Sequence, residues 1–216
     1  MGKINQGILG GFAGKVGNVV GGSWKGINYM RVKPASVSNP KTDGQVGQRS
    51  KFAIVLQFLQ PMKEHIKIGF RNYAVKKTEF NSAMSYNLNN AVIGEFPDFA
   101  IDYSSALVTK GSLPMALNAA GGSDLAGILQ VTWSDNSEEW KANSTDKAFI
   151  LVYNEAKAEA ISVKTGASRF DGSYQIQLPP SYQNETVEVF VSFITEDGKE
   201  LSNSVYAGSV TIQAAP

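Results

Sequence analysis

The sequence contains no cysteine and a single histidine, His65, among its 216 residues. The absence of cysteine excludes disulfide bonds, thiolate metal sites and cysteine nucleophiles, and it is compatible with either redox compartment. A general base or a zinc ligand at His65 would lack the partner residues that such sites use. Because His65 lies between Lys63-Glu64 and Lys67, we expect it on a solvated helix face.

The motifs that carry common enzyme chemistry are also missing. Gly14-Lys15 is followed by Val16, where a phosphate-binding loop requires Ser or Thr, and no Gly-x-Ser-x-Gly elbow occurs. Three carboxylates lie close together in a predicted loop, where we expect turn capping rather than paired acid–base chemistry: Glu95, Asp98 and Asp102. We therefore expect no enzymatic activity, no cofactor and no bound metal.

Long apolar runs are absent too. No stretch approaches the roughly 18–20 apolar residues that a membrane-spanning helix needs, so no membrane span is predicted. An early Lys3 precedes a short apolar stretch, but glycines interrupt it and no small-residue cleavage site follows, so no clear signal peptide is predicted. We expect a protein made in the cytoplasm, with export or cell-surface display by a signal-independent route left open.

Acidic residues are scarce in the first third of the chain. Residues 1–77 hold thirteen of the twenty Lys and Arg but only two acids, Asp43 and Glu64, which gives a formal balance of +11. Residues 78–216 hold seven bases and seventeen acids, a balance of −10. A chain with opposed halves suits either the binding of a polyanion or the end-to-end association of copies.

Glycine is abundant in the basic region, where nine of the twenty-one glycines precede residue 27. Residues 14–33 predict a β-hairpin with its turn at Gly21-Gly22-Ser23 and with Trp24 and Tyr29 as its large side chains. Glycine inside a strand weakens it and permits close approach of another backbone. An isolated hairpin of this kind is poorly stable and therefore needs a partner surface.

Three helices are expected after the hairpin. Asn39-Pro40 predicts the start of the first, which carries apolar residues at helical spacing: Val46, Phe52, Val55, Leu56 and Leu59. Pro61 predicts the start of a second helix that ends at Gly69, and a third covers about residues 79–92.

From Phe99 onward the apolar residues alternate, which is typical of strands. The candidate strands are 99–108, 112–118, 127–133, 147–153, 158–164, 174–178, 186–194 and 203–212, with a turn at Asp197-Gly198 between the last two. The predicted fold class is α+β, mainly β, in which a glycine-rich hairpin and a few helices precede an antiparallel β-sandwich. We expect two domains, a basic hairpin and helical region over 1–110 and the sandwich over 111–216.

The sandwich segment resembles a known module. The residues that carry the resemblance are Leu129-Gln130-Val131-Thr132-Trp133, Ala148-Phe149-Ile150-Leu151-Val152-Tyr153 and Val187-Glu188-Val189-Phe190-Val191-Ser192-Phe193. Together they resemble a fibronectin type III module over about residues 112–214. The resemblance implies an immunoglobulin-like sandwich with Trp133 in its core and the strands of Tyr153 and Phe190 packed over it.

The other half also carries a recognisable pattern. After a glycine-rich opener that bears lysine come Ser23-Trp24-Lys25-Gly26, Tyr29-Met30-Arg31, Asn39-Pro40-Lys41-Thr42, Gln45 and Gln48-Arg49-Ser50-Lys51-Phe52. This pattern resembles an uncharacterised family of Bacteroidota proteins, a domain of unknown function, along the whole chain. The resemblance implies a source and an architecture but no activity. Similar Asn-Pro-x-Thr…Gln…Arg stretches occur in phage-like and surface structural proteins.

We expect a non-enzymatic structural subunit that self-assembles into a filament, tube or other surface or phage-like assembly through its basic N-terminal region. Its glycine-rich strands would add to a sheet edge of a neighbouring copy, and contacts that do not close would propagate. The expected partner is thus a second copy in a homo-oligomer. The candidate interaction residues are Val16, Val19, Val20, Trp24, Tyr29 and Arg31.

The alternative is an adaptor whose basic third binds nucleic acid or an acidic protein surface. Lysines and arginines interleaved with Trp24 and Tyr29 suit phosphate contacts and base stacking. No helix-turn-helix, zinc-finger or RNA-recognition signature accompanies them, so nucleic acid is the less favoured partner.

Overall fold

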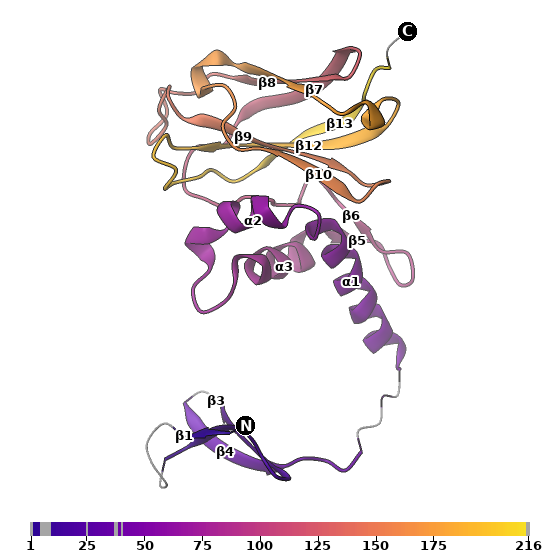
Figure 1. Ribbon diagram of the computed structural model, residues 1–216, viewed down its shortest axis with the longest axis vertical. Helices are drawn as coiled ribbons and strands as arrows, with labels where there is room; N and C mark the ends of the chain where they lie inside the picture. Colours follow the sequence, from indigo (N-terminus) through magenta and orange to yellow (C-terminus); the bar gives the residue numbers. More distant parts are fainter. Residues whose placement is uncertain (1, 5–9, 25, 37–38, 40, 215–216) are drawn as a thin grey trace. The chain divides into compact units, whose positions relative to one another are not determined.

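The computed structural model describes residues 2–4, 10–24, 26–36, 39 and 41–214 (Figure 1). The chain divides into two compact units, Met1–Thr42 and Asp43–Pro216. The boundary predicted between residues 110 and 111 does not coincide with this division. The physical reason is that the helices share a hydrophobic core with the sandwich rather than with the N-terminal strands.

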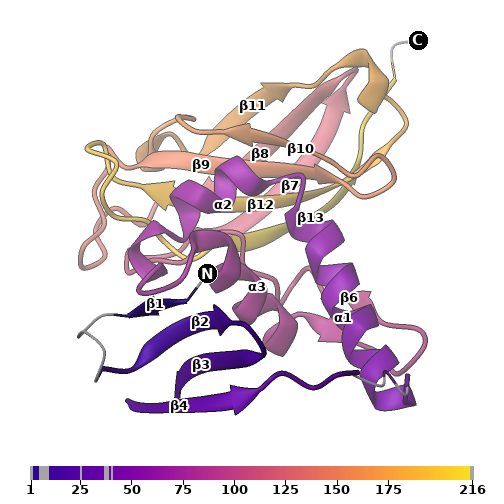
Figure 2. The ribbon, with the colours of Figure 1, turned by 60° about the horizontal axis from the view of Figure 1, so that its bottom comes forward.

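The Met1–Thr42 unit is a four-stranded antiparallel meander, in which Figure 2 shows β2, β3 and β4 side by side. Its strands are β1 (Lys3–Ile4), β2 (Phe12–Val16), β3 (Val19–Trp24) and β4 (Ile27–Val32). Two-residue connections join β2 to β3 and β3 to β4. Gly17 and Gly26 have φ of 57° and 85°, the left-handed conformation that tight hairpin turns require.

The hairpin turn predicted at Gly21-Gly22-Ser23 is wrong, because these residues lie inside β3. Gly21 pairs with Gly14 of β2 and with Met30 of β4. A Cβ atom on Gly21 would collide with the carbonyl oxygen and the ring of Phe12. Glycine at this position therefore serves close approach of the neighbouring strand, not chain reversal.

Three helices open the Asp43–Pro216 unit: α1 (Asp43–Leu59), α2 (Lys63–Gly69) and α3 (Glu79–Asn90), with a short 3-10 turn, η1 (Arg71–Tyr73), after α2. The start predicted for α1 at Asn39-Pro40 is wrong, and Pro40 itself lies outside the described residues. Lys41 has a φ of 49°, a left-handed conformation through which a right-handed helix cannot run. The third helix begins as expected, where the hydroxyl of Thr78 accepts from the Asn81 amide at 3.2 Å.

Two antiparallel sheets follow. The three-stranded sheet has the order β11-β8-β7 and the four-stranded sheet the order β10-β9-β12-β13. Their strands are β7 (Leu117–Leu125), β8 (Ile128–Ser134), β9 (Lys147–Asn154), β10 (Glu159–Val163), β11 (Ser173–Gln177), β12 (Thr186–Ile194) and β13 (Val205–Thr211). A small ladder, β5 (Val92–Ile93) with β6 (Ala100–Ile101), and two 3-10 turns, η2 (Arg169–Asp171) and η3 (Pro180–Tyr182), complete the unit.

Six of the eight predicted strands are confirmed to within a few residues, and two are wrong. The strand predicted over 99–108 shrinks to Ala100–Ile101, because the Asp102 carboxylate accepts from the Ser104 amide at 3.0 Å and turns the chain. The strand predicted over 112–118 lies at 117–125 instead. Leu113 forms only an isolated bridge with Ser202, and since Pro114 has no N–H to donate to a ladder, the continuous pairing with β8 begins beyond it.

The unit has three layers: the helices, the four-stranded sheet and the three-stranded sheet (Figure 1). Strand β9 is buried on both faces, since Ile150 and Val152 face the other sheet while Leu151 and Tyr153 face the helices. Trp133 lies in the sandwich core, as predicted, and its Nε1 donates to the Arg169 carbonyl at 2.8 Å. The strand of Tyr153 packs over it, but the Tyr153 ring itself faces the helices.

Candidate assembly surface

The register of the N-terminal sheet sorts its side chains onto two faces, because paired residues share a face and neighbours along a strand alternate. We call one of them the basic face; it carries Lys3, Lys15, Val20, Trp24, Ile27, Tyr29 and Arg31. The other, which we call the apolar face, carries Phe12, Val16, Val19, Met30 and Val32.

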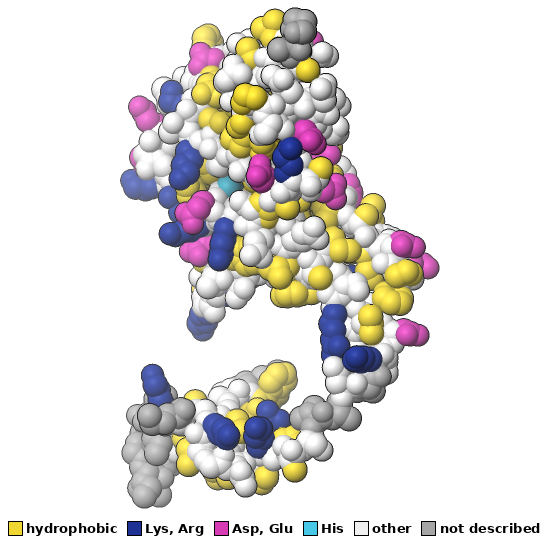
Figure 3. Space-filling view, turned by 45° about the vertical axis from the view of Figure 1, so that its right-hand side comes forward, with side chains coloured by type: hydrophobic (Ala, Val, Ile, Leu, Met, Phe, Trp, Pro, Cys, Tyr) yellow, Lys and Arg dark blue, Asp and Glu magenta, His cyan; other side chains and the backbone are white. Residues whose placement is uncertain are grey.

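This sheet buries almost nothing. Gly21 is the one buried residue in the described part of the Met1–Thr42 unit. Large apolar side chains remain exposed on both faces, with Trp24 at 67% and Met30 at 71% of their full accessibility. In Figure 3 the side chains of this unit are blue, yellow and white, since its sequence contains six Lys and Arg and no acid. Exposed apolar side chains of this size are common on surfaces that bind other proteins, so this sheet is the candidate assembly surface.

The structure brings four of the six predicted interaction residues together on the basic face: Val20, Trp24, Tyr29 and Arg31. It places Val16 and Val19 on the apolar face. Sequence reasoning missed three exposed residues of the edge strand β4, namely Ile27, Met30 and Val32. The signal that would have found them is the continuous strand pattern of residues 27–32, which leaves large apolar residues on both faces.

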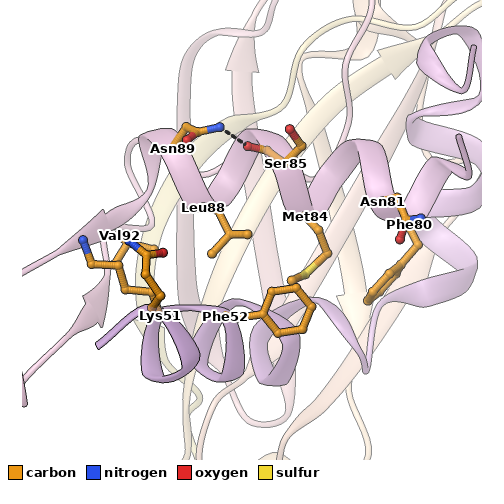
Figure 4. A pocket seen from close by; sticks show the side chains of 10 residues that line it. Lys51, Phe52, Phe80, Asn81, Met84, Ser85, Leu88, Asn89 and Val92 are labelled. Atoms are coloured by element: carbon orange, nitrogen blue, oxygen red, sulfur yellow. Dashed lines mark hydrogen bonds between the residues drawn. The ribbon is translucent and has the colours of Figure 1, made fainter. Parts of the chain in front are cut away.

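A groove of about 660 Å³ runs between α1 and α3 (Figure 4). Phe52 of α1 lies opposite Met84 and Leu88 of α3, and Phe80 and Val92 complete the apolar part of the lining. Phe52 is half exposed rather than part of the core. Amide and hydroxyl side chains line the rest, with Lys51 as the charged group in it: Gln48, Asn81, Ser85 and Asn89. A groove of this composition can bind apolar side chains.

His65 is buried, and the prediction of a solvated face is wrong. Its ring stacks on Phe149 at 3.9 Å between centroids, and its Nδ1 lies 2.8 Å from Ser162 Oγ. Burial, helped by Lys164, lowers the pKa of His65 to about 3, so the ring stays neutral. Its Nε2 has no hydrogen-bond partner among the described residues, so the pair with Ser162 lacks the orienting carboxylate of a catalytic triad.

Arg169 is a fully buried charged residue that contacts several segments. Its guanidinium lies 3.2 Å from Asp146 and donates to Asn136 Oδ1 and to the Pro114 carbonyl. It also lies 3.9 Å from the centroid of the Phe193 ring. These contacts join the loops at one end of the sandwich, so the residue stabilises the fold.

The described residues contain neither a cluster of metal ligands nor a membrane-spanning helix. In the part of the chain that the structure describes, no three His, Asp or Glu side chains gather closely enough to hold a metal ion. None of the described helices combines the length and the apolar character needed to cross a membrane.

Two facing antiparallel sheets with Trp133 between them define a fibronectin type III-like sandwich. The fibronectin type III domain of the human collagen alpha-1(XX) chain is similar, with a TM-score of 0.37 and 15% identity over 49% of this chain and 90% of that one. The FN1–FN3 domains of chicken CNTN1 are similar with a TM-score of 0.38 and 18% identity, over 50% of this chain and 37% of that one.

Residues 11–208 match the family described as a family of unknown function, DUF6266, and the chain belongs to that family. The match spans both compact units, so the N-terminal sheet and the helix-covered sandwich are parts of one family architecture. No curated protein matches the chain.

Proposed function

We propose that this protein is a non-enzymatic structural subunit that assembles with copies of itself through its N-terminal sheet. The observation that carries the proposal is the chemistry of that sheet: it has basic and large apolar side chains, no acid, and almost no buried residue. A small sheet without a core of its own gains stability by covering its apolar side chains with a partner.

A second copy is the partner that charge favours. The Asp43–Pro216 unit carries fourteen Lys and Arg against nineteen Asp and Glu, a formal charge of −5, whereas the Met1–Thr42 unit carries +6. The two units of different copies therefore attract each other over distances set by the salt concentration. A contact between unlike surfaces is heterologous, and it propagates into a filament or closes into a ring.

Strand β4 supports the same proposal, because it ends the sheet order β1-β2-β3-β4. Each of its six residues, Ile27–Val32, is exposed. The outer edge of β4 presents a row of backbone N–H and C=O groups to which a strand of a neighbouring copy can be added.

The proposal is tested by light scattering and electron microscopy of the full chain at low and high salt. We expect assemblies at low salt that dissociate as salt rises, because screening weakens attraction between the units. The double variant Lys15→Glu/Arg31→Glu reverses the basic face and should remain a monomer. The matched variant Lys67→Glu/Lys77→Glu makes the same charge change on exposed residues of the other unit and should still assemble.

A monomer at both salt concentrations would contradict the proposal, and so would unchanged assembly of Lys15→Glu/Arg31→Glu. A monomer that shifts a labelled oligonucleotide at low salt would instead favour the adaptor function, in which Trp24 and Tyr29 stack on bases.

A further inference from the structure

A pocket of about 260 Å³ lies beside α1 in the Asp43–Pro216 unit and is rich in aromatic rings. Phe58 comes from α1, Tyr153 from β9, and Phe99 and Tyr103 from the chain on either side of β6. The carboxylate-bearing side chain in its lining is Glu155, which is exposed just beyond the end of β9. Rings and a carboxylate from three separate segments thus meet in one pocket.

The rings form a connected cluster. Phe58 contacts Tyr153 and Tyr103 edge to face, with centroids 5.3 Å and 5.6 Å apart. Phe58 and Tyr153 are buried, whereas Tyr103 and Phe99 are half-buried and accessible. The ammonium of Lys51 already lies 4.8 Å from the centroid of the Phe99 ring. A ring in this pocket therefore attracts a cation, as the negative face of an aromatic ring does in general.

Besides the ammonium of Lys51, three carboxylates lie in the lining of the pocket or near its tyrosines, and no described ion pair holds any of them. Burial raises the pKa of Tyr103 and of Tyr153, and the charge of Glu155 raises both further, that of Tyr153 to about 12. Both phenols therefore remain neutral. Asp102 accepts from Ser104 Oγ at 2.6 Å, and Glu188 accepts from the hydroxyl of Tyr206. Among the described residues none of these three carboxylates pairs with Lys or Arg, so the site favours an incoming cation.

We propose that this pocket receives a lysine or arginine side chain from the N-terminal sheet of a second copy. This inference rests on the proposed self-assembly and names the surface that the basic sheet would contact. A long aliphatic stem fits an aromatic lining, and its charged head would reach the carboxylate of Glu155. The Met1–Thr42 unit supplies six such side chains and no acid that Glu155 would repel.

The first experiment is zero-length carbodiimide cross-linking of an equal mixture of nitrogen-14 and nitrogen-15 protein at low salt. The reagent joins an amine to a carboxylate that it already touches, and the isotopes tell whether both come from one copy. We expect cross-links between Glu155 of one isotope and Lys3, Lys15 or Lys33 of the other. Cross-links at Glu155 confined to one isotope would overturn the proposal. Assemblies in which Glu155 is never cross-linked, and which form equally with Glu155→Gln, would overturn it while leaving self-assembly intact.

The second experiment separates the pocket from assembly by using n-butylammonium as a soluble probe at high salt. We expect the probe to shift the ring NMR signals of Tyr103 and Tyr153. Glu155→Gln should weaken its binding about threefold, as expected for a partly exposed ion pair. The matched variant Glu138→Gln, in an exposed loop away from the pocket, should bind as the unchanged protein does. If these shifts were absent, or if Glu155→Gln bound the probe as tightly as the unchanged protein, the proposal that this pocket binds a cationic side chain would be wrong. This conclusion would hold whether or not the protein self-assembles.

Discussion

The two compact units of this chain differ in how much apolar surface they bury. The Asp43–Pro216 unit has two hydrophobic cores on the two sides of one sheet, and it even buries an ion pair between Arg169 and Asp146. The Met1–Thr42 unit has strands, turns and a defined register, yet Gly21 is the one residue buried in its described part. The comparison teaches that regular secondary structure does not imply a self-sufficient core. A sheet that leaves its apolar side chains exposed, as this one does, would gain stability from a partner, in line with the proposed self-assembly.

The largest expected effect would break the stable unit. Arg169→Met should cost about 3–5 kcal/mol in the free energy of unfolding, because Asp146 would remain buried without a counter-charge. Urea unfolding measures this change. Lys199→Met serves as the control: it removes an ion pair with Asp197 whose lysine side chain is 80% exposed, and no comparable loss is expected. Equal stability of Arg169→Met and the unchanged protein would contradict the importance of this buried pair.

The next largest effect is expected from acidification, which should lower the free energy of unfolding through His65. Its pKa is about 3 in the folded chain against an ordinary value of 6.5, so the unfolded chain takes up a proton first as the pH falls. The contribution of His65 to the free energy of unfolding is fully present above about pH 6.5. Below that pH it should decrease by on the order of 1 kcal/mol per pH unit until the pH reaches about 3.

The variant His65→Phe isolates this effect, because it keeps a ring against Phe149 but cannot be protonated. Urea midpoints between pH 6.5 and 4.5 should fall for the unchanged protein and much less for the variant. Carboxylates such as Asp102, whose pKa is lowered by its serine partners, stay ionised in this range. Parallel curves for the two proteins would show that His65 is not the group responsible.

A smaller effect would test whether the helices and the sandwich are one unit. Thr78→Ala removes the N-cap of α3 and should cost about 1 kcal/mol, whereas Thr78→Ser keeps the hydroxyl and should cost little. Because the helices share a core with Tyr153 and Phe190, amide hydrogen exchange in β9 and β12 should accelerate together with that in α3. Acceleration confined to the helices would favour separate domains and the boundary predicted at 110/111.

The smallest stability change is expected in the N-terminal sheet. Met30→Ser should alter the urea unfolding of the Asp43–Pro216 unit by no more than about 0.5 kcal/mol, since Met30 is 71% exposed. The same change should weaken association measured by light scattering, because it removes apolar surface from the sheet. Val75→Ser, at an equally exposed position of the other unit, is the control and should change neither quantity. If Met30→Ser associated as strongly as the unchanged protein, the apolar face would not be part of the proposed contact.

Sequence periodicity predicted the sandwich well and the N-terminal unit less well. Strands β8, β9 and β12 were predicted from their apolar residues, and the resemblance to a fibronectin type III module placed Trp133 correctly in the core. The turn predicted at Gly21 and Gly22 was wrong, because glycine occurs both in turns and in strands where an aromatic ring packs against the backbone. His65 misled because its flanking Lys63, Glu64 and Lys67 are solvated while its own side chain turns inward onto Phe149.

The candidate site divides in the same manner. The basic, acid-free character of the first residues is a property of composition, and it needs no fold to be seen. The pocket of Phe58, Phe99, Tyr103, Tyr153 and Glu155 was not predictable, since these residues are up to 97 positions apart and no motif joins them.

The sequence alone therefore determined the class of the fold and the separation of charge, because both follow from composition and local period, while the family of the chain was indicated by the resemblance of its N-terminal motifs. Tertiary structure alone decided where the units divide, that β9 is covered on both faces, that His65 and Arg169 are buried, and which aromatic rings meet Glu155. These features depend on contacts between residues distant in the chain. Alternation along a strand tells which side chains share a face, but only the neighbouring layers decide which face is covered.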